Sequence, residues 1–272
     1  MELGTIGIWR TNRQGIETVP LLDELGFGTL WIGGSPGVEE MRAYLEATSA
    51  MTVATGILNV WQHDPADVAA QFAVVAGEHP GRFLLGIGIG HPEATSAYRK
   101  PLATMRAFLD GLDAAPRPVP RDARIVAALG PRMLELAATR SLGTHPYFVP
   151  VEHTRIARAA VGPEAVVATE VAVVVETDPG TARRLAREYA ARYLATSNDT
   201  TNLERLGYTE AEFADGGSDR LIDAVVPHGS AEALAEVVRA HLDAGADHVC
   251  LQPVGHGPDP EDDYRALAAA LL

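Results

Sequence analysis

Short apolar runs alternate with helix-like segments along the chain, and this alternation limits the possible folds more than any other feature. Several of the runs are apolar on both faces, as buried parallel strands are. In chain order the eight runs are LGTIGIW, GTLWIG, VATGILNV, RFLLGIGI, RIVAALG, HPYFV, VVATEVAVVV and ADHVCLQ. Eight strand-helix units in 272 residues predict an α/β fold of the (β/α)8 TIM-barrel type rather than a doubly wound sheet.

The helical segments carry recognisable start and stop signals. An aspartate followed by proline, or a serine, favours a helix start because its side-chain oxygen can accept from the first free backbone N–H groups. The predicted starts are Asp64-Pro65, Asp178-Pro179 and Ser230. Gly245 fits the stop of the helix that Ser230 begins.

Two segments interrupt the alternation. The proline-rich stretch DAAPRPVPRDAR cannot be helical throughout, so it is expected to be an exposed connection before the fifth strand. The stretch 197–229 lies between the seventh and eighth helical patterns and contains LERLGYTEAEF and SDRLIDAVV. We expect a helical insertion over one mouth of the barrel, before the last helix-strand unit.

Composition narrows the function classes. The net charge is −14 with scattered arginines, which argues against nucleic acid as a partner. No run approaches the roughly 18 apolar residues of a membrane span, and MELGTIGIWR lacks the pattern of a secretory signal, so a cytoplasmic location away from membranes is expected. The lone cysteine, Cys250, allows neither an intrachain disulfide nor a cysteine-based zinc site, and is expected to be buried.

Polar residues follow several strands, where the active sites of such barrels lie. They are Trp9 and Arg10, then Asn59, Trp61 and His63, then Gly88, Gly90 and His91, then Gly130, Pro131 and Arg132. No carboxylate cluster occurs among them, which disfavours a metal centre, although His63, His91 and His153 remain a possible converging set. The absence of a G-x-S-x-G elbow disfavours nucleophilic hydrolysis.

Two glycine-containing stretches admit both a structural and a functional interpretation. Glycines 86, 88 and 90 remove side chains from one strand face, which permits either close barrel packing or the approach of a flat ligand. The turn Gly130-Pro131-Arg132 opens a helix whose backbone N–H groups and arginine could hold a phosphate, although such a turn is also common without a ligand.

Four strings resemble the luciferase-like monooxygenase superfamily. HPGRFLLGIGIGHPEA resembles its fourth-strand signature, and ATGILNVWQHDPADVAAQ resembles its third strand and following helix. AALGPRMLELAATRSLGTHPYF and AHLDAGADHVCLQ are similar to its fifth and eighth units. The likeness is greatest to the deazaflavin-dependent branch, which uses coenzyme F-420. It implies one luciferase-like domain over residues 1–272.

The resemblance also implies roles for single residues. It places a cis peptide bond at Gly56-Ile57 under the cofactor ring and directs Asn59 toward ring or substrate. His91 lies where relatives carry a glutamate that assists proton transfer, so it is the catalytic candidate or a hydrogen-bond partner of the ring. The same likeness gives the cofactor-binding set Gly56, Ile57, Asn59, Gly88, Gly90, His91, Gly130, Pro131 and Arg132.

The resemblance leaves the substrate open, because Gly33-Gly34-Ser35 stands where several relatives have an aspartate-histidine pair. The candidate substrate-binding residues are Trp9, Trp61, His63 and His153, while Trp31 fits the barrel core at least as well. The implied activity is F-420-dependent hydride transfer to or from a small organic substrate. An FMN-dependent monooxygenase and a non-catalytic flavin-binding barrel are the alternatives. Because members of the superfamily commonly dimerise, the resemblance also implies a homodimer.

Overall fold

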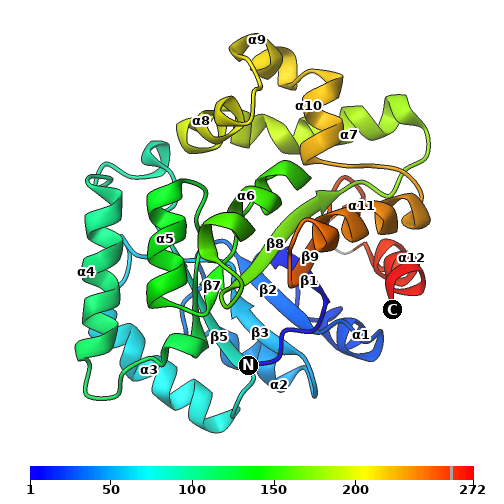
Figure 1. Ribbon diagram of the computed structural model, residues 1–272. Coiled ribbons are helices and arrows are strands. Elements are labelled where there is room, and N and C mark those ends of the chain that lie inside the picture. The colour runs from blue at the N-terminus through cyan, green and yellow to red at the C-terminus, as the bar shows by residue number, and fades with distance from the viewer. Residues whose placement is uncertain (258–259) are drawn as a thin grey trace.

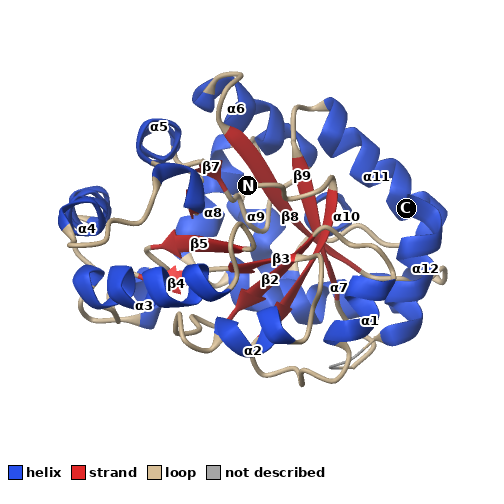
Figure 2. Cartoon of the chain, turned by 90° about the horizontal axis from the view of Figure 1, so that it is seen from below, coloured by secondary structure: helices blue, strands red, loops and turns tan. Residues whose placement is uncertain are grey.

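The strands close into a parallel barrel surrounded by helices, as Figure 2 shows from below in a computed structural model that describes residues 1–257 and 260–272. The strands are β1 (Ile6–Thr11), β2 (Thr29–Gly33), β3 (Thr52–Thr55), β4 (Leu58–Asn59), β5 (Phe83–Gly88), β6 (Arg124–Val126), β7 (Gly143–Thr144), β8 (Val166–Val173) and β9 (His248–Pro253). Their order is β3-β2-β1-β9-β8-β7-β6-β5-β4, and the additional β3–β5 pairing closes the ring. The predicted (β/α)8 barrel is confirmed.

Nine strand segments make eight barrel strands because the third strand is interrupted. β3 and β4 both pair with β5, through Val53 opposite Phe83 and Leu58 opposite Ile87. The break between them contains the Gly56-Ile57 peptide bond, which is cis as the resemblance implied. The predicted run VATGILNV therefore forms one barrel strand in two pieces.

Alternate side chains of each strand face inward and outward, as the period of two requires. The inward cluster is a packed core of Trp9, Trp31, Ala54, Leu84, Ile125, Ala168 and Cys250, with Leu3 below it. The outward side chains, such as Ile8 and Leu85, join the larger core between sheet and helices. Trp31 and Cys250 are fully buried, so both are core residues.

The sixth strand differs from its prediction. HPYFV was expected to be the strand, but β7 ends at Thr144 and these residues follow it. His145 still donates its backbone N–H to Val126, and Pro146 still accepts from Glu170. Pro146 has no N–H to continue the ladder, and Phe148 adopts a left-handed backbone with φ of 54°, which ends the extended run.

Helices connect the strands (Figure 1). They are α1 (Val19–Glu24), α2 (Met41–Glu46), α3 (Pro65–Glu78), α4 (Pro101–Ala114), α5 (Pro131–Arg140), α6 (Val151–Val161), α7 (Pro179–Leu194), α8 (Ser197–Arg205), α9 (Glu210–Phe213), α10 (Asp219–Val225), α11 (Ala231–Asp243) and α12 (Glu261–Leu271), with short 3₁₀ turns η1 (Pro92–Ala94), η2 (Arg121–Ala123) and η3 (Ala214–Gly216). No helix within the described ranges is long and apolar enough to span a membrane.

The predicted helix starts are confirmed by their hydrogen bonds. Asp64, Asp178 and Ser230 each accept from backbone N–H groups of the first turn of α3, α7 and α11. Gly245 follows the end of α11 with φ of 105°, a conformation that favours glycine. The proline-rich stretch leaves α4 at Ala114 and contains only the short η2 before β6, as expected.

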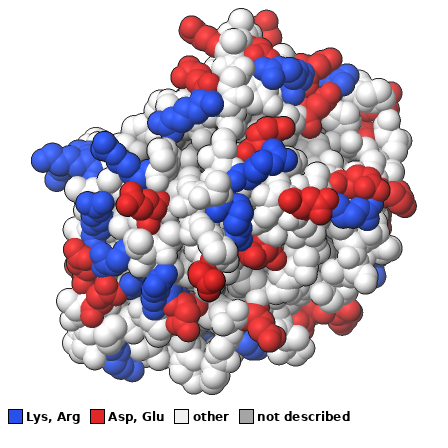
Figure 3. Space-filling view, viewed as in Figure 1, with Lys and Arg blue, Asp and Glu red and all other residues white. Residues whose placement is uncertain are grey.

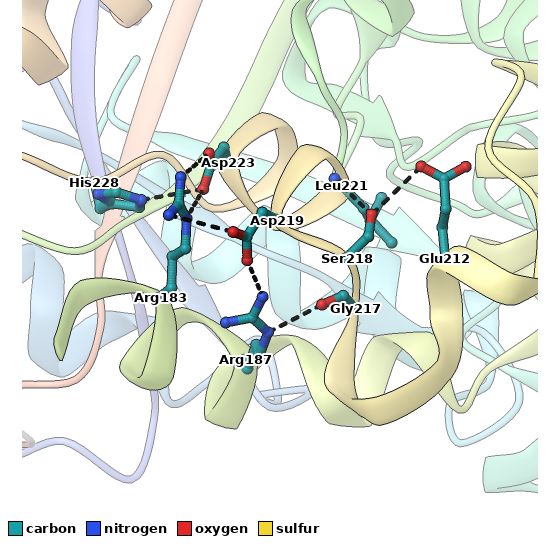
Figure 4. Close-up of polar contacts among 9 residues, drawn as sticks. All are labelled: Arg183, Arg187, Glu212, Gly217, Ser218, Asp219, Leu221, Asp223 and His228. Atoms are coloured by element: carbon teal, nitrogen blue, oxygen red, sulfur yellow. Dashed lines mark hydrogen bonds and ion pairs between the residues drawn. The ribbon is translucent and has the colours of Figure 1, made fainter. Parts of the chain in front are cut away.

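The predicted insertion is helical and contains α8, α9, η3 and α10. Figure 1 shows it together with α7 across the upper end of the barrel. Its α10 is fixed to α7 by the contacts drawn in Figure 4: Arg183 donates to both carboxylate oxygens of Asp223 at 2.8 and 2.7 Å, and Arg187 donates to Gly217 O at 2.9 Å and pairs with Asp219. His228 lies 3.1 Å from Asp223. These contacts hold the insertion over the barrel.

Candidate active site

A cavity of about 680 Å³ opens where the barrel strands end, beneath α7 and α8. It brings together most of the residues predicted from the sequence, which come from the ends of four barrel strands: Trp9, Gly56, Ile57, Asn59, Gly88, Gly90, His91 and Gly130. A site assembled from many strand ends at this face is the usual arrangement of a TIM-barrel enzyme.

The remaining predicted residues lie outside this cavity. Pro131 and Arg132 line a neighbouring cavity of about 720 Å³ that shares Gly130 with the first. Trp61 lies behind the wall, where its indole Nε1 donates to Ile89 O at 2.7 Å. His63 is half-buried and lines neither cavity.

His153 also lies away from the cavity. It is buried on α6, with its Nε2 3.2 Å from Leu129 O, so it supports the wall from outside. His63, His91 and His153 are therefore not gathered at one point. Within residues 1–257 and 260–272, no group of three or more His, Cys, Asp or Glu side chains could hold a metal ion.

The third strand supplies part of the cavity floor. Trp9 donates its indole N–H to Gly56 O at 3.0 Å, which fixes the indole against the interrupted strand. On β5, a Cβ at Gly86 would lie 1.9 Å from Thr55 O, so this glycine permits close barrel packing. A Cβ at Gly88 would lie 2.8 Å from Ile57 Cγ1 at the cavity surface. Close packing therefore explains Gly86, whereas Gly88 lies at the cavity surface.

His91 faces a carboxylate that sequence reasoning missed. Its Nδ1 lies 3.6 Å from Asp199 Oδ2, and the Asp199 side chain is only 3% exposed. Burial raises the pKa of the Asp199 carboxyl to about 6, while the Thr196 hydroxyl and His91 lower it. Asp199 belongs to α8 in the insertion, so no strand-end pattern could have pointed to it.

Comparison with known proteins agrees with this architecture. Residues 10–110 match the model of a family described as luciferase-like monooxygenase. The barrel has the luciferase-like fold. The matched residues include the third-strand and fourth-strand strings on which the resemblance rested, whereas the fifth and eighth units lie outside them.

Solved structures similar to this luciferase-like barrel include F-420-dependent enzymes and monooxygenases. An F-420-dependent secondary alcohol dehydrogenase in complex with an F-420-acetone adduct is 15% identical, with a TM-score of 0.76 and 98% of each chain covered. The coenzyme F-420-dependent tetrahydromethanopterin reductase from Methanopyrus kandleri is 18% identical, with a TM-score of 0.79 and 98% of each chain covered.

One of the similar monooxygenases contains FMN. The oxygenating constituent of 3,6-diketocamphane monooxygenase from the CAM plasmid of Pseudomonas putida, in complex with FMN, is 16% identical with a TM-score of 0.68, and 98% of this chain and 96% of that chain are covered. At these identities the likeness establishes the fold.

An aromatic wall, which the sequence did not reveal, closes the cavity of the luciferase-like barrel beside α7. The Tyr147 hydroxyl lies 2.8 Å from the hydroxyls of Tyr189 and Tyr193 and 2.7 Å from Gln252 Oε1. The Arg192 guanidinium lies over the rings of Tyr189 and Tyr193, at 4.8 and 5.1 Å from their centroids. These contacts fix the shape of the wall, and Arg192 gives it one positive charge.

The barrel interior below this wall holds a buried carboxyl. Glu170 Oε2 accepts from the backbone N–H of Phe148 at 3.0 Å, while Oε1 has no hydrogen-bond partner within the described residues. Burial raises the pKa of the Glu170 carboxyl to about 8, against the lowering effects of that hydrogen bond and of Arg192. At neutral pH the carboxyl is therefore mostly protonated.

The second cavity forms a basic basin, defined here by Lys100, Arg106, Arg132 and Arg205. Among the described residues none of these four cations forms an ion pair with a carboxylate. Figure 3 shows basic side chains gathered over the upper ends of α4 and α5, on a molecule whose net charge is −14. The basin shares Pro101, Gly130, Met133 and Arg205 with the first cavity, so the two are continuous.

Proposed function

We propose that this chain is a coenzyme F-420-dependent oxidoreductase that transfers a hydride between the deazaflavin and a small organic substrate. The observation that carries the proposal is the continuity between the cavity, which contains His91, and the basic basin. One end offers a partly apolar chamber for a flat ring, and the other offers unpaired cations for an anionic tail.

The residues of the basin fit the phosphate of such a tail. Helix α5 begins at Pro131 and has no side-chain cap. Pro131 lacks an N–H, and the N–H groups of Met133 and Leu134 donate to Gly130 O, so the backbone N–H of Arg132 is the first-turn group that an anion could meet. Arg132 lies in that turn, and Lys100 and Arg205 also line the basin. An anion placed there would meet both the helix N-terminus and charged donors.

The number of cations favours F-420 over FMN. The deazaflavin carries carboxylates beyond its phosphate, whereas FMN ends at its phosphate. Four cations without acidic partners exceed what one phosphate needs, and they suit a longer polyanion. The resemblance of the third-strand and fourth-strand strings to the deazaflavin-dependent branch supports the same choice.

The chain's own residues orient and protect the reacting groups in this proposal. When bound, F-420 supplies the hydride acceptor or donor, so no protein nucleophile is required. Trp9, Ile57 and Gly88 shape the chamber floor, and α8 covers its roof and excludes water. His91 holds or releases the proton that accompanies hydride transfer, since its ring borders the chamber.

Equilibrium titration of the purified protein with F-420 and with FMN tests the cofactor assignment. Tight binding of F-420 with weak binding of FMN supports the proposal and justifies a screen of small alcohols, ketones and conjugated carbonyl compounds for substrate-dependent absorbance change. Binding of neither cofactor would remove the assignment.

An FMN-dependent monooxygenase is the second candidate, because the matching family model is described as luciferase-like monooxygenase and one similar structure contains FMN. It predicts tight FMN binding and oxygen consumption with substrate. A non-catalytic flavin-binding barrel, the third candidate, predicts cofactor binding without any turnover. The proposal also includes a homodimer, which light scattering of the purified chain would test.

A further inference from the structure

We propose that Asp199 is a positioning residue for His91, which accepts a hydrogen bond from imidazole Nδ1–H and so directs Nε2 into the cavity. The contact between the two side chains is independent of the proposed function, whereas its role in proton transfer rests on that function. Nothing in the strand-end pattern suggests this carboxylate, because the helical insertion supplies it.

Both atoms of the pair are buried, and His91 Nδ1 has no hydrogen-bond partner among the described residues. His91 Nδ1 is buried and makes no hydrogen bond within the described residues, and the carboxylate oxygen facing it is Asp199 Oδ2 at 3.6 Å. A movement of less than about 1 Å would bring the two atoms to hydrogen-bonding distance. Leaving a buried nitrogen without a hydrogen bond is costly, and Asp199 Oδ2, which already accepts from Thr196, can accept a second hydrogen bond from Nδ1–H.

The start of α8 contacts residues on both sides of His91. Asn198 donates its side-chain amide to Gly90 O at 2.9 Å, and the backbone N–H of Ser197 donates to Glu93 Oε1 at 3.0 Å. Tyr98 also lies within hydrogen-bond distance of Asn198, at 3.4 Å. The carboxylate and the imidazole loop are thus fixed to each other by contacts that involve neither side chain of the pair.

Asp199 is itself oriented from its own helix. The Thr196 hydroxyl donates to Asp199 Oδ2 at 2.5 Å, which leaves the carboxylate directed toward the loop of His91. The imidazole side chain is 34% exposed although Nδ1 is buried, so its accessible edge lies on the other side of the ring. That edge carries Nε2, for which the described residues offer no hydrogen bond, and His91 borders the cavity.

The charged groups facing the pair are few. Glu93 lies on the exposed side of the loop and raises the pKa of Asp199, and the buried Glu170 interacts with Asp199 from below. Because burial raises the Asp199 pKa to about 6, the carboxylate is charged and able to accept from Nδ1–H at pH 8. We expect the Nδ1–H tautomer of His91 to dominate there.

Nitrogen NMR of the cofactor-free protein tests the contact without relying on any activity. In ¹⁵N-histidine-labelled protein at pH 8, His91 should show the shifts of an Nδ1–H tautomer, and Asp199→Asn should move the population toward Nε2–H. Glu93→Gln removes the same charge from the exposed side of the loop and is the matched control that should leave the tautomer unchanged. An unchanged His91 tautomer in Asp199→Asn would overturn the proposal.

A reciprocal measurement covers the case in which Asp199→Asn does not fold. In His91→Gln, removal of the imidazole should move the titration midpoint of the Asp199 carboxyl upward from about 6, as read by ¹³C NMR of labelled aspartate. An unmoved midpoint would contradict the pairing.

With a substrate in hand, Asp199→Asn should lower kcat about tenfold or more with little change in KM, and should alter the acid limb of the kcat pH profile. An unchanged kcat and profile would contradict the positioning role. If F-420 does not bind, the proposed function is wrong. The two NMR measurements would still test the contact between Asp199 and His91.

Discussion

The imidazole of His145 stacks on the indole of Trp31 at the centre of the barrel, with ring centroids 4.1 Å apart and planes inclined by 6°. His145 Nδ1 lies 2.8 Å from Ala168 O, so the ring is a neutral Nδ1–H donor. Trp31 in turn donates its indole N–H to His248 Nε2 at 3.0 Å. The barrel core is therefore polar at its centre without carrying a charge.

This core predicts a loss of stability in acid. Burial lowers the pKa of His145 to about 4, so between pH 6.5 and 4 the unfolded chain binds a proton that the folded chain does not. Replacement of His145 by Gln should reduce by one the difference in bound protons between the unfolded and the folded chain. The free energy of urea unfolding should then depend less steeply on pH over that window, whereas His79→Gln on the α3 terminus should leave the slope as it is.

The buried Glu170 predicts a dependence of the opposite sign. Its raised pKa means that the folded chain keeps a proton which the unfolded chain releases, so stability should fall as the pH rises from 4.5 to about 8. Glu170→Gln should flatten this decline, whose limiting slope is about 1.4 kcal/mol per pH unit. Urea unfolding at several pH values measures it, and the exposed Glu164→Gln serves as control. Equal slopes in wild type and Glu170→Gln would contradict the prediction.

Two glycines of β5 should respond differently to an added methyl group. Gly86→Ala forces a Cβ against Thr55 O, a backbone atom, and should destabilise the protein by about 1–3 kcal/mol. Gly88→Ala meets only the side chains of Ile57 and Ala127 at the cavity floor, so it should weaken cofactor binding more than it lowers the melting temperature. Thermal unfolding and cofactor titration of both variants separate the two effects, and the reverse ranking would count against the assigned floor.

The basic basin predicts a salt-sensitive cofactor affinity. Arg132→Ala should weaken F-420 binding severalfold, because one exposed charge contact of this kind is worth about 1 kcal/mol or less. The loss should shrink as ionic strength rises. Arg155→Ala, an exposed arginine on α6 outside the basin, is the matched control. If Arg132→Ala and wild type bind F-420 equally well at low salt, the anionic tail of the cofactor does not bind in the basin.

The contacts between α7 and α10 predict that Asp223 holds the insertion in place. Asp223→Asn weakens its paired contact with Arg183 and its contact with His228. Proteolysis within residues 197–229 should then become severalfold faster, because local opening exposes that segment. Asp243→Asn, on the exposed side of α11, should leave the cleavage rate unchanged.

The barrel and its mouth could be predicted from local sequence because each strand carries its own apolar pattern, and because residues after parallel strands converge at one end. Trp9, Asn59 and His91 were located in this way. The sixth strand was misplaced because the apolar composition of HPYFV outweighed the missing N–H of Pro146. His153 was misassigned to the mouth because a position near a strand end does not determine which way a helical side chain points.

The residues that sequence reasoning missed come from segments without a strand pattern. Arg192 and Tyr193 lie on α7, and Asp199 and Arg205 lie on α8. Their place above the mouth depends on how the insertion folds back over the barrel, which the α7–α10 contacts determine. The spacing of these residues along the chain therefore does not predict their position above the mouth.

Helix α8 carries Asp199 near its start and Arg205 at its end, so a single nine-residue rod borders both the imidazole loop and the basic basin. An anion bound in the basin would contact Arg205 on the same helix that carries Asp199, the partner of His91. Thermodynamic linkage then requires reciprocity: if an occupied basin changes the affinity of the imidazole for its proton, the proton must change the affinity of the basin for the anion by the same factor.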